Sequence, residues 1–393
     1  MYSTCLGRSL QMSNNKYFEY FDIDEDYFPQ INDYSIAAAK PDFWMTTYPH
    51  ETFINMLSSM ERVLSRQKKR SIWIEGAYGT GKSLCSYALM KILEVPEEEL
   101  HAYWNKYQPL KKKPDLLEKL IGHKQRGIVP VYRYASGSIT SPRDLFYAIQ
   151  ESIKAALEKK GLYTGGNTLK ESVIAWIDEP SHKQFIDILL KKPEWAALFS
   201  QSTADDVLNA LRKGREVKQL MNNLLRLADK EGITALNINA DRLLEWITDV
   251  IDKNNVKIVF IWDELSDYFN NNRESLSEFQ KIVELVSIKP FYFIVVTHKS
   301  GQLFTIADST WTKVRDRFIQ VNIALPDNIA FDLIGHAFKT KQAAQNNWEI
   351  LDDDLNSRVN SSRAAVTKAT KITDPQVMKN IMPLHPMAAL VLK

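Results

Sequence analysis

The sequence has few cysteines, and none of its apolar runs is long. Two cysteines, Cys5 and Cys85, cannot form a framework of disulfides, and this usage suits a reducing compartment. No apolar run reaches the roughly 18 residues that a membrane span needs. The first residues, MYSTCLGRSLQM, lack the apolar segment of a signal peptide. We therefore expect a cytoplasmic protein that has no membrane partner.

Glycine and proline are sparse, and neither sign of charge is in excess. The 14 glycines and 15 prolines are scattered, which excludes a low-complexity chain. Fifty basic and 48 acidic side chains leave a formal charge of +2, which excludes a polybasic protein, although a local patch could still contact nucleic acid. A chain of 393 residues can bury a large core unaided and predicts two to three domains at about 150 residues each.

Five short apolar segments alternate with patterns of helical spacing. Helices are expected over residues 52–66, 83–93 and 141–159. Continuous apolar runs of strand length are typical of strands buried on both faces of a parallel sheet. We therefore predict an α/β fold with a parallel five-stranded sheet covered on both faces. The expected strands are residues 70–75, 129–134, 256–262, 291–297 and 318–325.

The remaining segments are expected to be helical. Residues 160–255 contain no convincing strand, and the region after Pro326 also has helical patterns. The final run, residues 384–392, looks like the opening of a helix, so we expect the protein to continue beyond it. We expect an N-terminal extension (1–45), a core (46–140 and 256–326), a large helical insertion (141–255) and a C-terminal helical lid (327–393).

The strongest motif is a glycine-rich loop between an expected strand and an expected helix. Its residues fit the pattern G-x-x-x-x-G-K-[ST] completely. The glycines let backbone N–H groups turn toward phosphates, the lysine neutralises the β- and γ-phosphates, and the serine hydroxyl ligates Mg²⁺. Cys85 is expected to be a core residue of the following helix. We assign nucleotide binding to Gly76, Ala77, Tyr78, Gly79, Thr80, Gly81, Lys82, Ser83 and Leu84.

A second motif places two carboxylates directly after an apolar strand. Val259 to Trp262 leads into Asp263 and Glu264. Ligands of open α/β sheets bind at the carboxyl ends of the strands. We predict that Asp263 supports Mg²⁺ together with Ser83, and that Glu264 activates the attacking water as a general base.

Three further polar residues are candidates for catalysis. Thr297 ends the next strand, where it could reach the γ-phosphate or the water; the alternative is a helix cap or turn residue. Arg315 and Arg317 precede the last strand, where a guanidinium could reach a nucleotide held by a neighbouring subunit. The alternative is that both arginines only pair with nearby acids such as Asp308 and Asp316.

This order of motifs resembles that of AAA+ ATPases, over roughly residues 45–340. The resemblance implies a 5-1-4-3-2 strand order, a helical lid, and a ring with nucleotide between subunits. More narrowly, the strings WDELSDYF, VRDRF and PLHP look similar to the large ATPases of bacterial anti-phage systems of the BREX and RADAR types. The long helical stretch between the second and third strands departs from a compact module. No clear lid arginine is present, and Arg363 is only a candidate.

Two other features have open interpretations. In ATPases of similar sequence the segment around His50 lines the adenine pocket, so His50 or Tyr48 could touch the base; a plain helix entry fits equally well. Lys111 to Lys113, with Lys119, Lys124 and Arg126, could contact nucleic acid, but interrupting acids favour a solvated face.

The expected function is Mg²⁺-dependent ATP hydrolysis that drives conformational change or assembly of a larger complex, with a homo-oligomeric ring and an effector protein as partners. The alternative is a nucleotide-gated oligomerisation switch that recruits an effector with little turnover. A small-molecule kinase is disfavoured by the adjacent Asp263 and Glu264 carboxylates and by the lack of an evident acceptor pocket.

Overall fold

The chain forms two compact units in the computed structural model. One unit comprises Met1–His50 and Ala324–Lys393, and the other comprises Glu51–Ile323. Tyr78, assigned above to the nucleotide loop, lies outside the described part of the chain. The structure describes residues 16–23, 42–67, 70–77, 79–135, 139, 141–166, 168–213, 217–236, 239–271, 276–298, 314–324, 327–370, 372 and 375–392.

The larger unit is built on a five-stranded sheet in which every neighbouring pair is parallel. The strand order is β3-β4-β5-β2-β6. Counted within this sheet, that is the 5-1-4-3-2 order implied by the resemblance, and it is compatible with a P-loop fold without identifying one. The prediction of an α/β fold with a parallel five-stranded sheet is confirmed. The strands are β2 (Ser71–Gly76), β3 (Ile128–Tyr134), β4 (Lys257–Asp263), β5 (Phe291–His298) and β6 (Phe318–Asn322).

Burial along the strands follows their place in the sheet. In β4 and β5 all residues are buried except Lys257 and His298, because both faces of these inner strands are covered. In the edge strand β6 only Phe318 and Val321 are buried. This strand was expected to reach residue 325 but ends at Asn322. Its neighbour β2 turns into the glycine-rich loop at Gly76, so no partner strand remains beyond that point.

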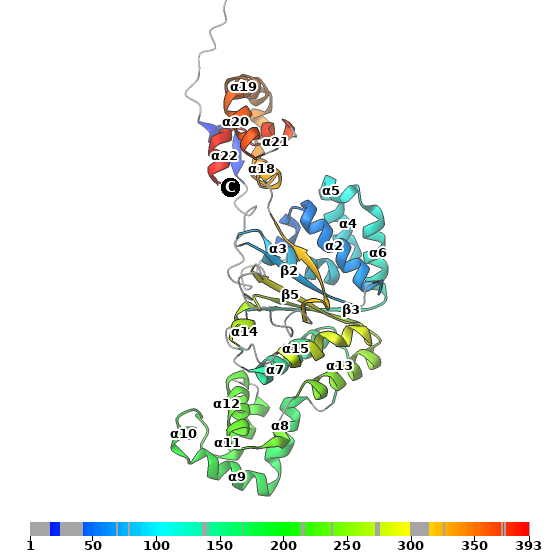
Figure 1. The fold of residues 1–393 in the computed structure, drawn as a ribbon, viewed down its shortest axis with the longest axis vertical. Helices are drawn as coiled ribbons and strands as arrows, with labels where there is room; N and C mark the ends of the chain where they lie inside the picture. Colours follow the sequence, from blue (N-terminus) through cyan, green and yellow to red (C-terminus); the bar gives the residue numbers. More distant parts are fainter. Residues whose placement is uncertain are drawn as a thin grey trace, which may run out of the picture. The chain divides into compact units, whose positions relative to one another are not determined.

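Helices cover both faces of this sheet (Figure 1). One face carries α2 (Glu51–Leu64), α3 (Lys82–Glu94) and α6 (Pro114–Gln125), and the other carries α7 (Pro142–Lys159), α13 (Ala240–Asn254) and α15 (Leu276–Glu284). The hydroxyl of Ser141 accepts a hydrogen bond from the Asp144 N–H and so begins α7 where the sequence predicted. Helix α6 and the two helices before it, α4 (Glu97–Lys106) and α5 (Gln108–Lys111), were not predicted from the sequence.

The described part of the stretch between α7 and α13 contains helices joined by turns and no strand. A capping box of Thr168 and Glu171 begins α8. The apolar faces of these helices join one hydrophobic core with Trp73, Phe260 and Phe293 of the sheet. The helices are α8 (Leu169–Asp178), α9 (Pro180–Leu190), α10 (Pro193–Ala196), α11 (Ala204–Lys213) and α12 (Val217–Lys230), and α14 (Ser266–Asn271) follows β4.

The smaller unit combines the two ends of the chain. A core that includes Phe331, Val366 and Ile381 is shared by α18 (Asp327–His336), α20 (Asn360–Thr370), α21 (Pro375–Asn380) and α22 (Pro386–Leu392). Helix α19 (Gln345–Arg358) packs against α20. A short antiparallel pair, β1 (Phe21–Ile23) and β7 (Phe338–Thr340), was not expected from the sequence. No helix in the described residues of either unit is long and apolar enough to cross a membrane.

Candidate nucleotide site

The glycine-rich loop leaves β2 and begins α3, as its motif requires. Gly79 and Gly81 adopt φ of 75° and 80°, a left-handed conformation that side chains with a Cβ disfavour. At Gly76 a Cβ would lie 2.3 Å from the carbonyl oxygen of Ile323 and 2.9 Å from Thr80 Oγ1. The loop therefore depends on glycine for two separate reasons, namely backbone conformation at Gly79 and Gly81, and space at Gly76.

Lys82 lies over this loop with its ammonium group turned inward. Lys82 Nζ donates a hydrogen bond of 2.8 Å to the Ala77 carbonyl oxygen, and the residue is only 7% exposed. Burial lowers the pKa of Lys82, and the carboxylates of Asp263 and Glu264 act in the opposite direction. The lysine is thus near both carboxylates, and it is held by a loop carbonyl that a phosphate oxygen can replace as acceptor.

Asp263 is buried at the end of β4 and is surrounded by donors. Tyr132 donates its hydroxyl to Asp263 Oδ2 at 2.8 Å, and the Glu264 N–H donates to Oδ1 at 2.9 Å. The Ser83 hydroxyl also hydrogen-bonds this carboxylate. Burial raises the pKa of Asp263, while the bonds from Ser83 and Tyr132 act against that rise.

The pairing of Ser83 with Asp263 provides hard oxygen ligands. A serine hydroxyl and a carboxylate next to a phosphate site are the donor set that suits Mg²⁺, which usually binds through one or two protein oxygens and the substrate phosphates. Among the described residues no cluster of three or more His, Cys, Asp or Glu side chains could hold a metal ion by itself. The residues therefore fit a metal ion that arrives with a nucleotide, and do not form a complete cage.

Glu264 has an unusual backbone conformation. Its φ of 58° lies in the left-handed region, where a residue other than glycine is uncommon. Ala135, which follows the adjacent strand β3, has φ of 59°, and its N–H donates to the Asp263 carbonyl oxygen at 2.9 Å. Strained residues of this kind cluster at functional sites. Both strands thus turn sharply at the edge where the loop lies.

Thr297 lies within β5, opposite Glu75 of β2. Its side chain is buried, and Thr297 Oγ1 accepts a hydrogen bond of 2.9 Å from Trp73 Nε1. The hydroxyl hydrogen is not used in that bond and can still donate. Thr297 is therefore neither a helix cap nor a turn residue.

Arg315 and Arg317 lie near the amino-terminal ends of the strands, whereas the loop lies at their carboxyl-terminal ends. Phe318, the first residue of β6, pairs with Ser71, the first residue of β2, whereas the loop follows the last residue of β2. The six residues of β2 span about 20 Å at 3.3 Å per residue. An arginine before β6 can therefore approach only the loop of another chain.

The two arginines differ in their surroundings. Arg317 Nε donates to Glu284 Oε1 at 2.7 Å, and Arg317 Nη2 contacts the same carboxylate. The expected acidic partner was Asp308 or Asp316, of which Asp308 lies outside the described residues; the observed partner is Glu284, at the end of α15. Arg315 is exposed.

His50 lies in the smaller unit and is buried. Burial lowers the pKa of His50 to about 4, so the imidazole is neutral at pH 7. The ring of the neighbouring Tyr48 contacts that of His336 in a tilted arrangement, with ring centroids 4.7 Å apart. An uncharged imidazole can contact a base, but a buried histidine is also typical of a protein core.

The roles of two half-buried side chains, Tyr132 and Lys124, were not predicted from the sequence. Tyr132, the donor to Asp263, has no signal in any motif, since its partner is 131 residues away. Lys124 Nζ donates to the carbonyl oxygens of Ile92 and Val95, and burial lowers its pKa to about 8. Lys124 therefore caps the C-terminal end of α3 from within the fold. Cys85 is buried as expected, and burial raises the pKa of its thiol to about 12.

No protein-family model matches this sequence, and no curated protein matches it either. The functional assignment therefore rests on the residues themselves and on their geometry. The decisive geometry is the meeting of Lys82, Ser83, Asp263 and Glu264 at one edge of the sheet.

Proposed function

We propose that this chain is a cytoplasmic Mg²⁺-dependent ATPase that uses hydrolysis to drive conformational change or assembly in a larger complex. The observation that carries the proposal is that Lys82 is hydrogen-bonded within the glycine-rich loop and lies close to the carboxylates of Asp263 and Glu264. A chance glycine-rich turn would not be expected to place a lysine beside two carboxylates at the end of a buried strand.

Each residue of the site has a distinct role in this proposal. Backbone N–H groups of the loop at the start of α3 bind phosphate oxygens. Lys82 exchanges its Ala77 acceptor for the β- and γ-phosphates. Ser83 and Asp263 would hold Mg²⁺, which supplies neutralisation of phosphate charge when bound. Glu264 accepts the proton of the water that attacks in line with the leaving group.

Two further residues have proposed roles in nucleotide binding. Thr297 can donate its remaining hydroxyl hydrogen toward the γ-phosphate or the water, and Trp73 fixes its position. His50 is proposed to contact adenine through its neutral imidazole.

The position of the arginines supports a reaction that needs assembly. Because Arg315 and Arg317 precede β6, at the end of the sheet away from the loop, these two arginines can stabilise transition-state charge only when chains associate head to tail. This is the specific observation that also favours the second candidate, a nucleotide-gated switch in which ATP binding assembles an oligomer and recruits an effector. A role in bacterial anti-phage defence rests on the short sequence resemblance alone.

The proposal is tested by comparing the parent chain with Glu264→Gln and Asp263→Asn, with and without DNA or RNA. Loss of the general base should reduce ATP turnover at least about 100-fold while ATP binding is retained. Loss of the Asp263 carboxylate should instead remove the Mg²⁺ dependence of nucleotide binding. Glu98→Gln, an exposed glutamate on α4, is the matched control and should change neither property.

Sizing of the same samples separates the two candidates. Rapid turnover with a nucleic-acid or protein stimulus indicates a motor, whereas slow turnover with assembly on a non-hydrolysed analogue indicates a switch. If the parent chain does not bind nucleotide, or if Glu264→Gln hydrolyses ATP as fast as the parent, the assignment of this site is wrong.

A further inference from the structure

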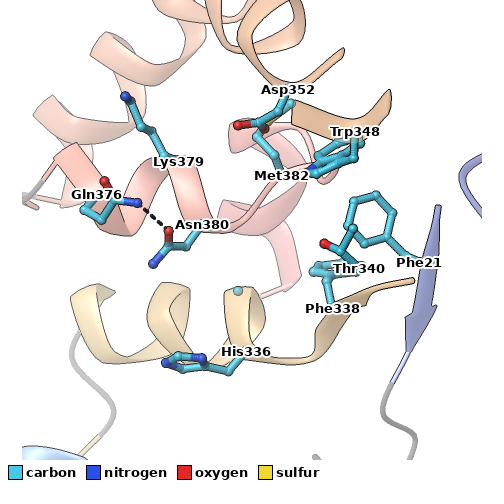
Figure 2. Close-up of a pocket in the computed structure, with 11 residues that line it drawn as sticks. Phe21, His336, Phe338, Thr340, Trp348, Asp352, Gln376, Lys379, Asn380 and Met382 are labelled. Carbon is cyan, nitrogen blue, oxygen red and sulfur yellow. Dashed lines mark hydrogen bonds between the residues drawn. The ribbon is translucent and has the colours of Figure 1, made fainter. Parts of the chain in front are cut away.

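The smaller unit contains a pocket of about 400 Å³ that the proposed ATPase reaction does not use. This volume falls within the range of roughly 300–1,000 Å³ that is usual for ligand sites. Figure 2 shows its aromatic residues on one side and the polar residues of α21 on the other. The lining residues are Phe21, Gly335, His336, Phe338, Thr340, Trp348, Asp352, Gln376, Lys379, Asn380 and Met382.

Three aromatic rings form one wall of this pocket. Phe21 of β1 packs edge-to-face on Trp348 of α19 with centroids 4.3 Å apart, and on Phe338 of β7 at 6.2 Å. The pairing of β1 with β7 holds these residues together although they come from opposite ends of the chain. Trp348 and Phe338 are only half-buried, so part of each ring remains accessible to a ligand.

Asp352 supplies a carboxylate beside this aromatic wall. In Figure 2 its carboxylate points from α19 toward α21. Asp352 Oδ1 is shielded from solvent and has no hydrogen-bond partner among the described residues. Burial raises the pKa of Asp352, and the adjacent Asp353 adds to that rise, while Asn356, Lys379 and Arg363 oppose it. The terminal torsion of aspartate is broad, so a small rotation offers either oxygen to a ligand.

The lining carries one acidic residue, Asp352, and one lysine, Lys379, and the guanidinium of Arg363 on α20 also acts on Asp352. Helix α19 carries Glu349, Asp352, Asp353 and Asp354 and only one basic residue, Arg358, which pairs with Asp354 at 2.7 Å. Lys379 is the lysine of the lining, and its side chain is exposed. In Figure 2 it extends away from the aromatic rings.

We propose that this pocket binds the arginine side chain of a basic peptide segment, with the guanidinium against Trp348 and Phe338 and paired with Asp352. A guanidinium is flat, stacks on aromatic faces and presents two parallel donors to a carboxylate. An ammonium is a compact point charge that has no planar fork of donors and is more strongly hydrated. Thr340 and the side-chain amide of Asn380 add polar contacts for the peptide backbone. Lys379 is the competing cation that the arginine displaces from the neighbourhood of Asp352.

The test uses four short peptides and the full chain without nucleotide, so its outcome does not depend on the ATPase. The probes are acetyl-Gly-X-Gly-amide peptides in which X is arginine, citrulline, lysine or glutamate, titrated by calorimetry or NMR. Citrulline keeps the shape of arginine but has no charge, so the arginine probe should bind at least about tenfold more tightly. The lysine probe should be intermediate, and the glutamate probe should not bind.

Variants of the lining residues locate the binding. Asp352→Asn should weaken the arginine probe about tenfold, whereas Asp353→Asn, which removes the same charge from the neighbouring exposed position, should change it less than about twofold. Trp348→Phe keeps the aromatic packing and should weaken binding about two- to fivefold, since tryptophan is the best cation–π partner. Lys379→Ala should tighten binding by a similar factor because it removes the competing cation. Thermal unfolding of each variant confirms that it is folded.

Several results would overturn this proposal. Equal binding of the citrulline and arginine probes would show that the pocket does not recognise the positive charge. Equal losses in Asp352→Asn and Asp353→Asn would show diffuse surface attraction and no pocket. Preferred binding of the glutamate probe, abolished by Lys379→Ala, would make this an anion site. Failure of the arginine probe to bind at millimolar concentration would also reject it.

Discussion

At the scale of single residues, the carboxylate of Asp263 is buried and held in place by several hydrogen bonds. It is 1% exposed and receives hydrogen bonds from Ser83, Tyr132 and the Glu264 N–H. A buried carboxylate would otherwise be driven toward its neutral form, in which it would be a poor metal ligand. Tyr132 is therefore inferred to position Asp263 and to favour its charged form.

Tyr132→Phe should remove this donor while keeping the ring that packs on Tyr87. A hydrogen bond to a charged group contributes about 1.5–3 kcal/mol, so the Mg²⁺ concentration needed for half-maximal ATPase activity should rise about tenfold or more. Without the Tyr132 hydroxyl the pKa of Asp263 rises further, so the acidic limit of activity should move to higher pH. The measurement is the rate of phosphate release as a function of Mg²⁺ and pH.

Tyr292→Phe is the matched control, since Tyr292 is a buried tyrosine near the start of β5. It should leave both profiles unchanged. An identical loss in the two variants would show that the effect is one of general stability. An unaltered Mg²⁺ requirement in Tyr132→Phe would remove the positioning role.

At the scale of elements, the turn from β2 into α3 depends on close packing against the chain that follows β6. The Ile323 N–H donates to the Glu75 carbonyl oxygen at 2.8 Å, and the Ile323 carbonyl then lies against Gly76. The contact is between backbone atoms, which cannot move apart without separating the two strands. Gly76, the first glycine of the motif, thus lets the phosphate loop pack closely against the backbone that follows β6.

Gly76→Ala should lower the free energy of unfolding by about 1–3 kcal/mol, as overpacking does, and should abolish ATP binding. Gly122→Ala is its counterpart on α6, where a Cβ meets nothing within 4 Å and the backbone is helical. That change should raise the free energy of unfolding by about 0.5–1 kcal/mol, since alanine has less conformational entropy to lose. Urea unfolding and titration with a fluorescent ATP analogue measure both effects, and a tolerated alanine at position 76 would contradict the packing argument.

At the scale of the whole molecule, the arginines before β6 and the phosphate loop lie at opposite edges of one sheet. This arrangement keeps Arg315 and Arg317 away from the phosphates that their own chain would bind. It fits the proposed ring, in which the phosphate loop of one chain lies against the residues that precede β6 in the next chain. Arg317 is already paired with Glu284, so Arg315 is the better candidate to reach across.

A mixing experiment tests this arrangement. Lys82→Ala and Arg315→Ala should each have little ATPase activity alone. When the two are mixed in equal amounts, about a quarter of the head-to-tail interfaces join an intact loop to an intact arginine, so activity should reappear. Arg317→Ala should instead lower stability through loss of its pairing with Glu284. Absence of any recovery, in samples that sizing shows to be mixed oligomers, would exclude Arg315 as a residue acting between chains.

Much of the larger unit was predictable because its signals are local. The five strands are contiguous apolar runs, the phosphate loop is eight consecutive residues, and Asp263 and Glu264 directly follow their strand. Parallel strands with helical connections then bring the loop and the carboxylates to one edge by a general rule of chain topology. Each of these features can be predicted from a short stretch of sequence, without knowing which distant residues are in contact.

The features that only the tertiary structure decided involve residues far apart in the chain. Tyr132 reaches Asp263 because β3 and β4 are neighbours, and β1 pairs with β7 across more than 300 residues. The pocket beside Asp352 likewise needs β1, β7, α19 and α21 together. A hydrogen bond or a pocket depends on side chains converging within a few ångströms, and no periodicity or motif in one segment records what a distant segment places against it. The left-handed turn at Glu264 has the same origin, since strain at one residue persists only where the surrounding structure imposes it.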